Sequence, residues 1–185
     1  MDERNQSLVA HVTKIGFSCE QGSENDVLDR FVKSARKYQA DVVVRITGDY
    51  LLADSELVGE CIRRFRTEHV DYFSNTDPPT YPDGLDIEVV TLAALEQAVC
   101  ESGKVYDHEH VTPYVREASQ FKKADMQNKE DLSALRWTVD EPTNFEVVTN
   151  IFTHFAPEIH FAWQQVLELQ RSQPNFSPAS SDESL

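Results

Sequence analysis

Two aspartates each follow a run of apolar, mostly β-branched residues. Asp49 ends the segment 41–49 (DVVVRITGD), and Asp140 ends the segment 135–140 (LRWTVD). Such runs predict buried strands, and open α/β sheets bind ligands at the carboxyl ends of their strands. Because Mg²⁺ is commonly held by one or two carboxylates and completed by substrate phosphates, Asp49 and Asp140 are candidate metal ligands for nucleotidyl transfer.

The same two aspartates have a simpler interpretation, in which each caps the helix or turn after its strand. Spacing alone favours capping. The metal assignment therefore depends on what other residues accompany Asp49 and Asp140.

Further polar residues could contact a substrate. Period-two alternation over residues 85–90 (LDIEVV) places Asp86 and Glu88 on one face of a strand, where they could contact sugar hydroxyls or water around a metal. The pattern alone favours a solvated face on an edge strand. In residues 107–110 (DHEH), a transition-metal site is disfavoured because side chains two residues apart diverge on a helix. His110 fits better as a hydrogen-bonding residue near a substrate.

The elements that would position these residues alternate between helical and strand patterns, which predicts an α/β fold with a mostly parallel sheet. A segment with three prolines and a glycine, residues 77–84, predicts a rigid loop. Trp137 and Phe145 are expected in the core. The expected helices cover residues 8–15, 26–38 (opened by Ser23 with Asp26), 54–65, 91–99, 107–118 and 143–155 (capped by Thr143 with Glu146), and the expected strands cover 17–19, 42–46, 70–73, 85–90, 121–126 and 135–139.

Length and charge restrict the function classes. The 185 residues include 17 Lys and Arg against 32 Asp and Glu, a formal net charge of -15, which disfavours nucleic acid and anionic membranes as partners. A bound divalent cation could still admit a small phosphorylated ligand. The three cysteines are widely spaced, which fits a reducing cytoplasm, and no apolar window reaches membrane-spanning length. We expect one domain over residues 1–171 and a disordered tail over 172–185.

Six motifs in this order resemble cytidylyltransferases of the spore coat polysaccharide biosynthesis type, relatives of the enzymes that activate acidic sugars as CMP conjugates. They are residues 22–31 (GSENDVLDRF), 44–49 (VRITGD), 74–76 (SNT), 81–89 (YPDGLDIEV), 109–114 (EHVTPY) and 135–142 (LRWTVDEP).

The resemblance implies a Rossmann-like three-layer nucleotide-diphospho-sugar transferase fold. It implies transfer of CMP from CTP to a sugar or sugar acid, with release of pyrophosphate. Asp49 and Asp140 are similar to the Mg²⁺ ligands of the sugar-acid enzymes. Contacts to the nucleotide or the sugar are expected from Arg45, Asn75, Tyr81, Asp86, Glu88 and His110.

The chain departs from the family pattern in two places. Tyr50-Leu51-Leu52 stands where the family usually has Cys-Pro-Leu after Gly48-Asp49, so the turn lacks a stiffening proline. The family's first strand and its basic phosphate loop have no counterpart, so we expect an amino-terminally truncated member, or a chain read from an internal start codon. The alternative is a catalytically inactive remnant or a sugar- or nucleotide-binding subunit. The sheet edge left by the missing strand would favour pairing with another chain, as in a homodimer.

Overall fold

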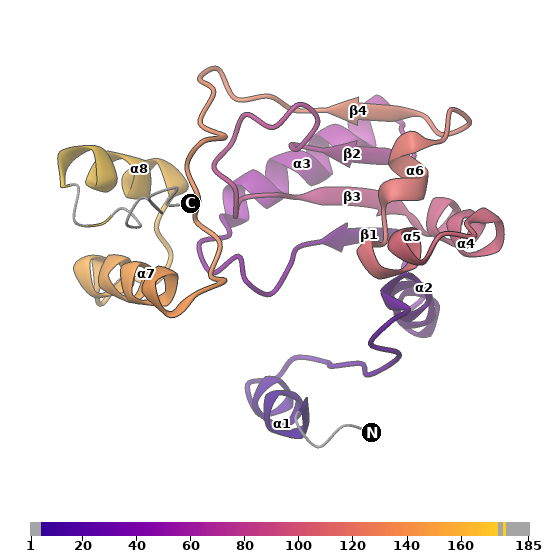
Figure 1. The fold of residues 1–185 in the computed structure, drawn as a ribbon, viewed down its shortest axis with the longest axis horizontal. Coiled ribbons are helices and arrows are strands. Elements are labelled where there is room, and N and C mark those ends of the chain that lie inside the picture. The colour runs from indigo at the N-terminus through magenta and orange to yellow at the C-terminus, as the bar shows by residue number, and fades with distance from the viewer. Residues whose placement is uncertain (1–4, 174–175, 177–185) are drawn as a thin grey trace, which may run out of the picture. The chain divides into compact units, whose positions relative to one another are not determined.

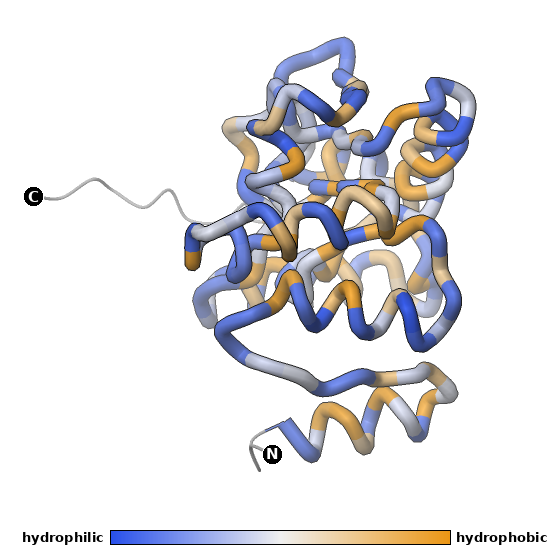
Figure 2. The backbone as a smooth tube through the Cα atoms, turned by 90° about the vertical axis from the view of Figure 1, so that its right-hand side faces the viewer, coloured by the Kyte–Doolittle hydropathy of each residue, from blue (hydrophilic) through white to orange (hydrophobic). Residues whose placement is uncertain are grey.

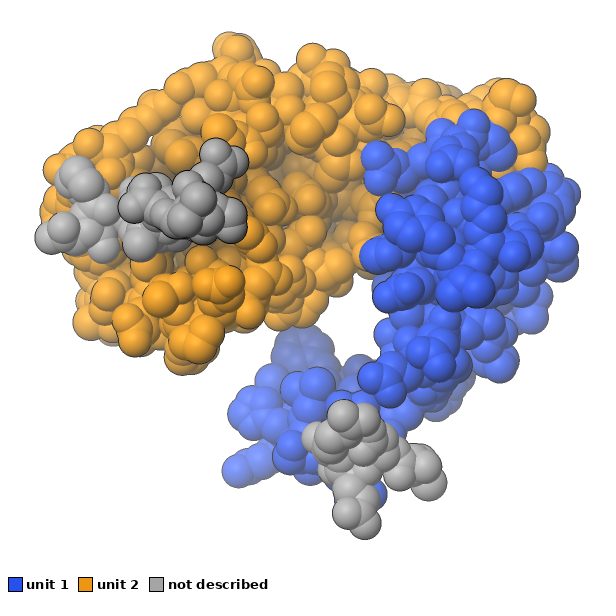
Figure 3. Space-filling model, viewed as in Figure 1, with its two compact units in different colours: residues 1–41, 92–118 blue, residues 42–91, 119–185 orange. Residues whose placement is uncertain are grey.

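The structure is a computed structural model that describes residues 5–173 and 176. The chain forms two compact units, one of residues 1–41 and 92–118 and the other of residues 42–91 and 119–185 (Figure 3). The expectation of one domain over residues 1–171 stays a prediction.

The second unit contains a four-stranded sheet in the order β1-β3-β2-β4 (Figure 1). Its strands are β1 (Val42–Arg45), β2 (Tyr72–Ser74), β3 (Glu88–Thr91) and β4 (Lys123–Asp125). β3 pairs antiparallel with both β1 and β2, whereas β2 and β4 are parallel. Three strands therefore run in one direction with β3 reversed between two of them, which confirms the α/β class.

For β1, the expectation of a buried strand with a parallel neighbour, which follows from the predicted buried strands and mostly parallel sheet, is wrong. β1 pairs antiparallel with β3, and its side chains are only partly buried. The apolar run of valines could not distinguish the two arrangements, because strand direction depends on the connection that returns the chain to the sheet. The register sets Arg45 opposite Glu88, and Glu88 opposite Ser74.

Helix α3 (Ser55–Glu68) contacts β2 and β3 and buries Leu57, Cys61 and Phe65 in the core of this unit. Asp54 caps the helix by accepting a hydrogen bond from the backbone N–H of Leu57 at 2.8 Å. The other Asp54 oxygen accepts the backbone N–H of Trp163 at 2.9 Å. That bond ties the start of α3 to the start of α8 (Trp163–Ser172), a helix that the sequence patterns did not predict.

The expected strand over residues 135–139 is wrong, because this segment is extended but pairs with a loop instead of the sheet. The backbone N–H of Asp83 donates to Leu135 O at 2.9 Å, and the N–H of Trp137 donates to Asp83 O at 2.6 Å. The approach requires Gly84, whose φ is +113° and whose added Cβ would lie 2.8 Å from the carbonyl carbon of Trp137. Trp137 is buried, as expected.

Helix α7 (Pro142–Phe155) follows directly. Its cap is Glu141, which forms a capping box with Asn144, so the expected cap of Thr143 with Glu146 is wrong. Pro142 occupies the first turn, where its missing N–H costs nothing. The expectation for Phe145 is also wrong, because its side chain is exposed.

The first unit is helical, with α2 (Val27–Lys37) packed against α4 (Leu92–Glu101) and α5 (Val105–His110). Asp26, and not Ser23, is the cap of α2, and its side chain accepts the N–H of Asp29 at 3.0 Å. The expected helix over 107–118 is divided, because Pro113 starts the separate helix α6 (Pro113–Glu117).

Helix α1 (Gln6–Lys14) has no buried residue. Hydrophobic and hydrophilic residues alternate along it (Figure 2). Gly16, with a φ of +93°, follows it, but residues 17–19 form no strand, so that expectation is wrong.

At the other end of the chain, Ser172 completes α8, and Phe176 packs against the core of the second unit. The remainder of the expected tail, residues 174–175 and 177–185, lies outside the described residues. None of the described helices is long and apolar enough to cross a membrane.

Candidate active site

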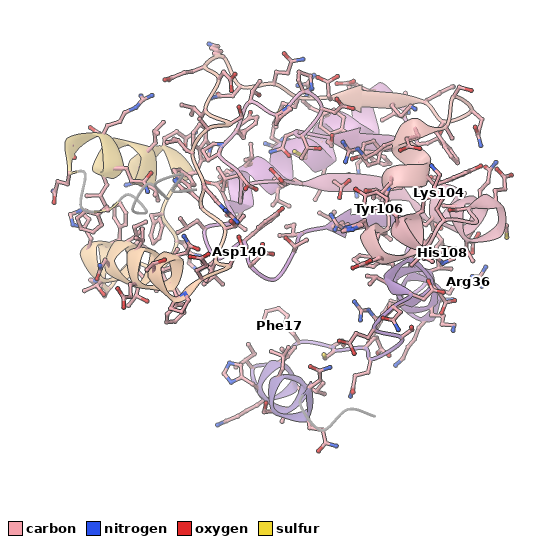
Figure 4. All side chains as sticks on the ribbon, in the orientation of Figure 1. Phe17, Arg36, Lys104, Tyr106, His108 and Asp140 are labelled. Carbon is pink, nitrogen blue, oxygen red and sulfur yellow. The ribbon has the colours of Figure 1, made fainter. Side chains whose placement is uncertain are left out.

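The two aspartates selected from the sequence are brought together by the backbone of the second unit. Asp49 lies beyond the end of β1, in the turn where Tyr50 N–H donates to Thr47 O at 3.3 Å. Its carbonyl oxygen accepts a hydrogen bond from the backbone N–H of Val139 at 3.1 Å. Asp140 follows Val139 directly, so this bond sets the backbone of the two aspartates side by side. Figure 4 shows Asp140 where the chain enters α7.

The Asp140 carboxylate is held by two side chains of its own segment. Thr138 Oγ1 donates to Asp140 Oδ2 at 2.8 Å, and Arg136 Nη2 donates to the same oxygen at 2.5 Å. The Thr138 hydroxyl and then the Arg136 guanidinium lower the pKa of Asp140. Asp140 is therefore ionised at neutral pH, as a metal ligand must be.

A third carboxylate, Asp83, was not selected from the sequence. Burial raises its pKa, and the negative charges of Asp140 and Asp49 raise it further against the opposing charge of Arg136. Asp83 thus lies within electrostatic reach of both predicted ligands. The signal in the sequence was the glycine after it, because Gly84 permits the close approach that fixes Asp83 beside residues 135–137.

Asp86 is held by Tyr50, the residue that stands in place of the family's usual cysteine. Tyr50 OH donates to Asp86 Oδ2 at 3.1 Å. Burial raises the pKa of Asp86, and the charges of Asp83 and Glu88 add to that effect. Burial likewise raises the pKa of Tyr50 to about 12, so Tyr50 stays a neutral donor that orients the carboxylate. The departure from the family pattern therefore supplies a hydrogen bond to a predicted site residue.

Glu88 and Arg45 form an ion pair across the sheet, in which Glu88 is buried and Arg45 is partly buried. Arg45 Nη1 donates to Glu88 Oε2 at 2.5 Å, and Tyr72 OH donates to Glu88 Oε1 at 2.6 Å. Glu88 is 4% exposed, so the interpretation of a solvated face is wrong for this residue. Substrate contact by Arg45 and Glu88 stays a prediction.

Asn75 and Tyr81 support the loops of this unit. The Asn75 amide donates to Leu85 O and accepts the N–H of Ile87, both at 2.8 Å. The Tyr81 ring packs edge-on against Trp163, with ring centroids 5.6 Å apart. Both residues are buried, and their contacts to a substrate stay predictions.

His110 belongs to the first unit, at the end of α5, and its exposed ring lies 4.3 Å from the Tyr106 ring between centroids. His108 Nδ1 instead contacts Asp26 Oδ1 at 2.9 Å. Figure 4 shows His108 near α2. The two histidines thus have separate environments. A substrate contact by His110 stays a prediction.

The oxygen ligands of the second unit, Asp49 and Asp140, suit a Mg²⁺ ion whose remaining coordination positions are filled by substrate phosphates. Within residues 5–173 and 176, no group of three His, Cys, Asp or Glu side chains surrounds a point that could hold a metal ion. Such a Mg²⁺ site commonly uses one or two carboxylates, which Asp49 and Asp140 would provide. Burial is the main cause of the raised pKa of Asp83, and the negative charges of Asp140 and Asp49 add to it; a cation beside them would offset that part of the effect.

Three comparisons with known proteins agree on the family. Residues 2–166 match the family model described as cytidylyltransferase. The chain is 31% identical to the uncharacterized protein MJ1063 of Methanocaldococcus jannaschii over 97% of this chain and 74% of the relative. It is 30% identical to the spore coat polysaccharide biosynthesis protein SpsF of Bacillus subtilis over 81% of this chain and 63% of that relative.

A solved structure supports the same assignment. A cytidylyltransferase from Leptospira borgpetersenii matches with a TM-score of 0.92 and 27% identity, over 97% of this chain and 76% of that one. The mixed sheet of the second unit is therefore the sheet of a nucleotidyltransferase-type Rossmann-like fold. With the family model covering most of its length, the chain belongs to the cytidylyltransferase family.

Proposed function

We propose that the chain transfers CMP from CTP to a sugar or sugar acid and releases pyrophosphate, as a step in polysaccharide biosynthesis. The observation that carries this proposal is the hydrogen bond from Val139 N–H to Asp49 O, which sets the segment of Asp140 against that of Asp49. Two carboxylate residues on backbone segments that touch, in a cytidylyltransferase, favour Mg²⁺-dependent nucleotidyl transfer.

The residues of the chain have separate tasks in this proposal. Asp49 and Asp140 would hold Mg²⁺, which when bound would supply positive charge against the phosphates and the pyrophosphate leaving group. Thr138 and Arg136 keep Asp140 ionised. Asp86, oriented by Tyr50, accepts a hydrogen bond from a hydroxyl of the acceptor.

The reaction is proposed for a reducing cytoplasm, where the three cysteines stay free thiols as they are in the structure. A homodimer is proposed as the assembly, joined through the edge of β1, which is one of the two terminal strands of the described sheet. An edge strand offers unpaired backbone groups to a second chain.

The test is release of pyrophosphate from CTP by the full chain, with Mg²⁺ and a panel of neutral, amino and acidic sugars. Asp49→Asn and Asp140→Asn should each abolish release, whereas the exposed Asp131→Asn should leave it unchanged, because Asp131 contacts only its neighbour Ser133 in the described residues. Equal release by all three variants would overturn the metal assignment. Binding of CTP or sugar without turnover would instead identify a binding subunit.

A further inference from the structure

Arg136 is paired with Asp140, one of the two carboxylates that the proposed site requires. Its guanidinium donates through Nη2 to Asp140 Oδ2 at 2.5 Å and through Nε to Thr138 Oγ1 at 3.0 Å. The negative charges of Asp140, Asp83 and Glu141 all act on it. Arg136 is thus the positive charge in a negative neighbourhood, and it already holds the oxygen that a metal would take.

The Arg136 side chain is free to leave this position. It is 61% exposed and the Asp140 side chain 44%, and ion pairs so open to water contribute little net stability. The site's other arginine differs, because Arg45 is 22% exposed and its partner Glu88 is 6% exposed. Separating that pair would leave the buried Glu88 charge without an opposite charge. Arg136 is therefore the guanidinium at this site that can change partners.

We propose, resting on the proposed function, that Arg136 is a phosphate-binding residue that exchanges partners when nucleotide arrives. In the free protein it neutralises Asp140. When Asp140 passes to Mg²⁺, the guanidinium turns to the phosphates of CTP. A planar guanidinium matches phosphate oxygens with two parallel hydrogen bonds, and the exchange leaves neither Asp140 nor Arg136 without an opposite charge.

Opposite changes in two affinities distinguish this role from a structural one. Removing the Arg136 charge frees Asp140, so the affinity for a divalent metal alone should increase, by about two- to five-fold. The same change removes charge-assisted hydrogen bonds to phosphate, so the affinity for CTP with metal should fall roughly ten-fold or more. A residue that only holds the segment in place would weaken both.

The experiment measures Mn²⁺ binding by electron paramagnetic resonance without nucleotide, and Mg²⁺-dependent CTP binding by calorimetry, on the full chain. Arg136→Gln should tighten Mn²⁺ and weaken CTP. Arg136→Lys keeps the charge but loses the planar fork, so it should leave Mn²⁺ near wild type and weaken CTP less. Arg171→Gln is the matched control, because Arg171 is also exposed, pairs with Glu130 and lies on α8; it should change neither affinity.

Either of two results overturns the proposal: Mn²⁺ binding that weakens in Arg136→Gln, or CTP binding that stays at the wild-type value. Failure of the proposed function gives a different result, in which the wild-type chain binds no CTP. In that case the phosphate role of Arg136 fails as well, while the Mn²⁺ measurement still decides whether Arg136 competes for Asp140. Melting temperatures of all variants show whether each has folded.

Discussion

Two arginine–carboxylate pairs of the second unit have the same separation and different surroundings. Arg45–Glu88 and Arg136–Asp140 each have a nitrogen–oxygen distance of 2.5 Å. The first joins neighbouring strands, and its Glu88 carboxylate also accepts a hydrogen bond from Tyr72. The second lies within one extended segment and is open to water. Distance alone does not tell a fixed pair from an exchangeable one. Burial decides whether a pair can exchange, because a charge that loses its partner is hydrated at the surface but left uncompensated in the interior.

The substitution Glu88→Gln tests most directly whether Arg45–Glu88 is a fixed pair. The change leaves the Arg45 charge without its partner inside the sheet, so the free energy of unfolding should fall by about 3 kcal/mol. Urea unfolding measures it. The matched control is Glu130→Gln, whose partner Arg171 stays in water and whose stability should stay near wild type. Equal stability of the two variants would show that Arg45–Glu88 is not a fixed pair.

Gly84→Ala tests the loop that holds the exchangeable pair in place. Its φ of +113° and the 2.8 Å approach to Trp137 strain any side chain, so unfolding should become easier by about 2 kcal/mol. Affinity for CTP should fall as well, because residues 135–140 shift. Gly48→Ala is the control, since its added Cβ meets nothing within 4 Å. A Gly84→Ala variant as stable as Gly48→Ala would refute the close approach.

Asp140→Asn tests the exchangeable pair itself. Because Asp140 and Arg136 are both exposed, the melting temperature without ligand should stay close to that of the wild type. The stabilisation by CTP with Mg²⁺ should disappear, since a ligand stabilises only the state that binds it. Thermal melting with and without CTP and Mg²⁺ measures both. An unchanged CTP-dependent shift in melting temperature would remove Asp140 from the metal site.

The sequence predicted best where a pattern is local. Val42 to Arg45, Ser55 to Glu68 and the helix after Asp26 follow from apolar periodicity and caps. It failed where the partner of a segment is distant. Residues 135–139 have the composition of a strand, yet they pair with the loop at Asp83, and no periodicity states which backbone lies alongside.

The same limit applies to the candidate site. Asp49 and Asp140 were found because each follows an apolar run within a motif of the family, and the backbone brings their segments together. Asp83 was missed because the charges that act on it come from residues far away in the chain. Arg136 was missed although its partner Asp140 lies only four residues further on, because no pattern states that these two side chains meet. Glu88 shares a strand face with Asp86 in the pattern, but its carboxylate is bound by Arg45 and Tyr72 across the sheet. Electrostatic roles require the tertiary structure.

A third pair, Asp26–His108, lies between the two extremes and gives the smallest expected effect. His108 is 24% exposed and Asp26 39%, and the pair joins the cap of α2 to α5. The Asp26 hydrogen bond raises the pKa of His108. Burial opposes the ionisation of Asp26, but His108 and the Asp29 N–H lower its pKa overall.

The signs of these shifts define a pH window for the Asp26–His108 pair. A raised histidine pKa adds stability that is complete below the unfolded value of about 6.5 and is lost as pH rises through the folded value. A lowered aspartate pKa adds stability that is lost as pH falls below about 3.8. His108→Gln should therefore lower the free energy of unfolding most near pH 5, by less than about 1 kcal/mol because both groups are partly solvated. Urea unfolding at pH 5 and pH 8 should show a difference from wild type that shrinks at the higher pH. A difference that grows with pH would mean that His108 is held as the neutral ring.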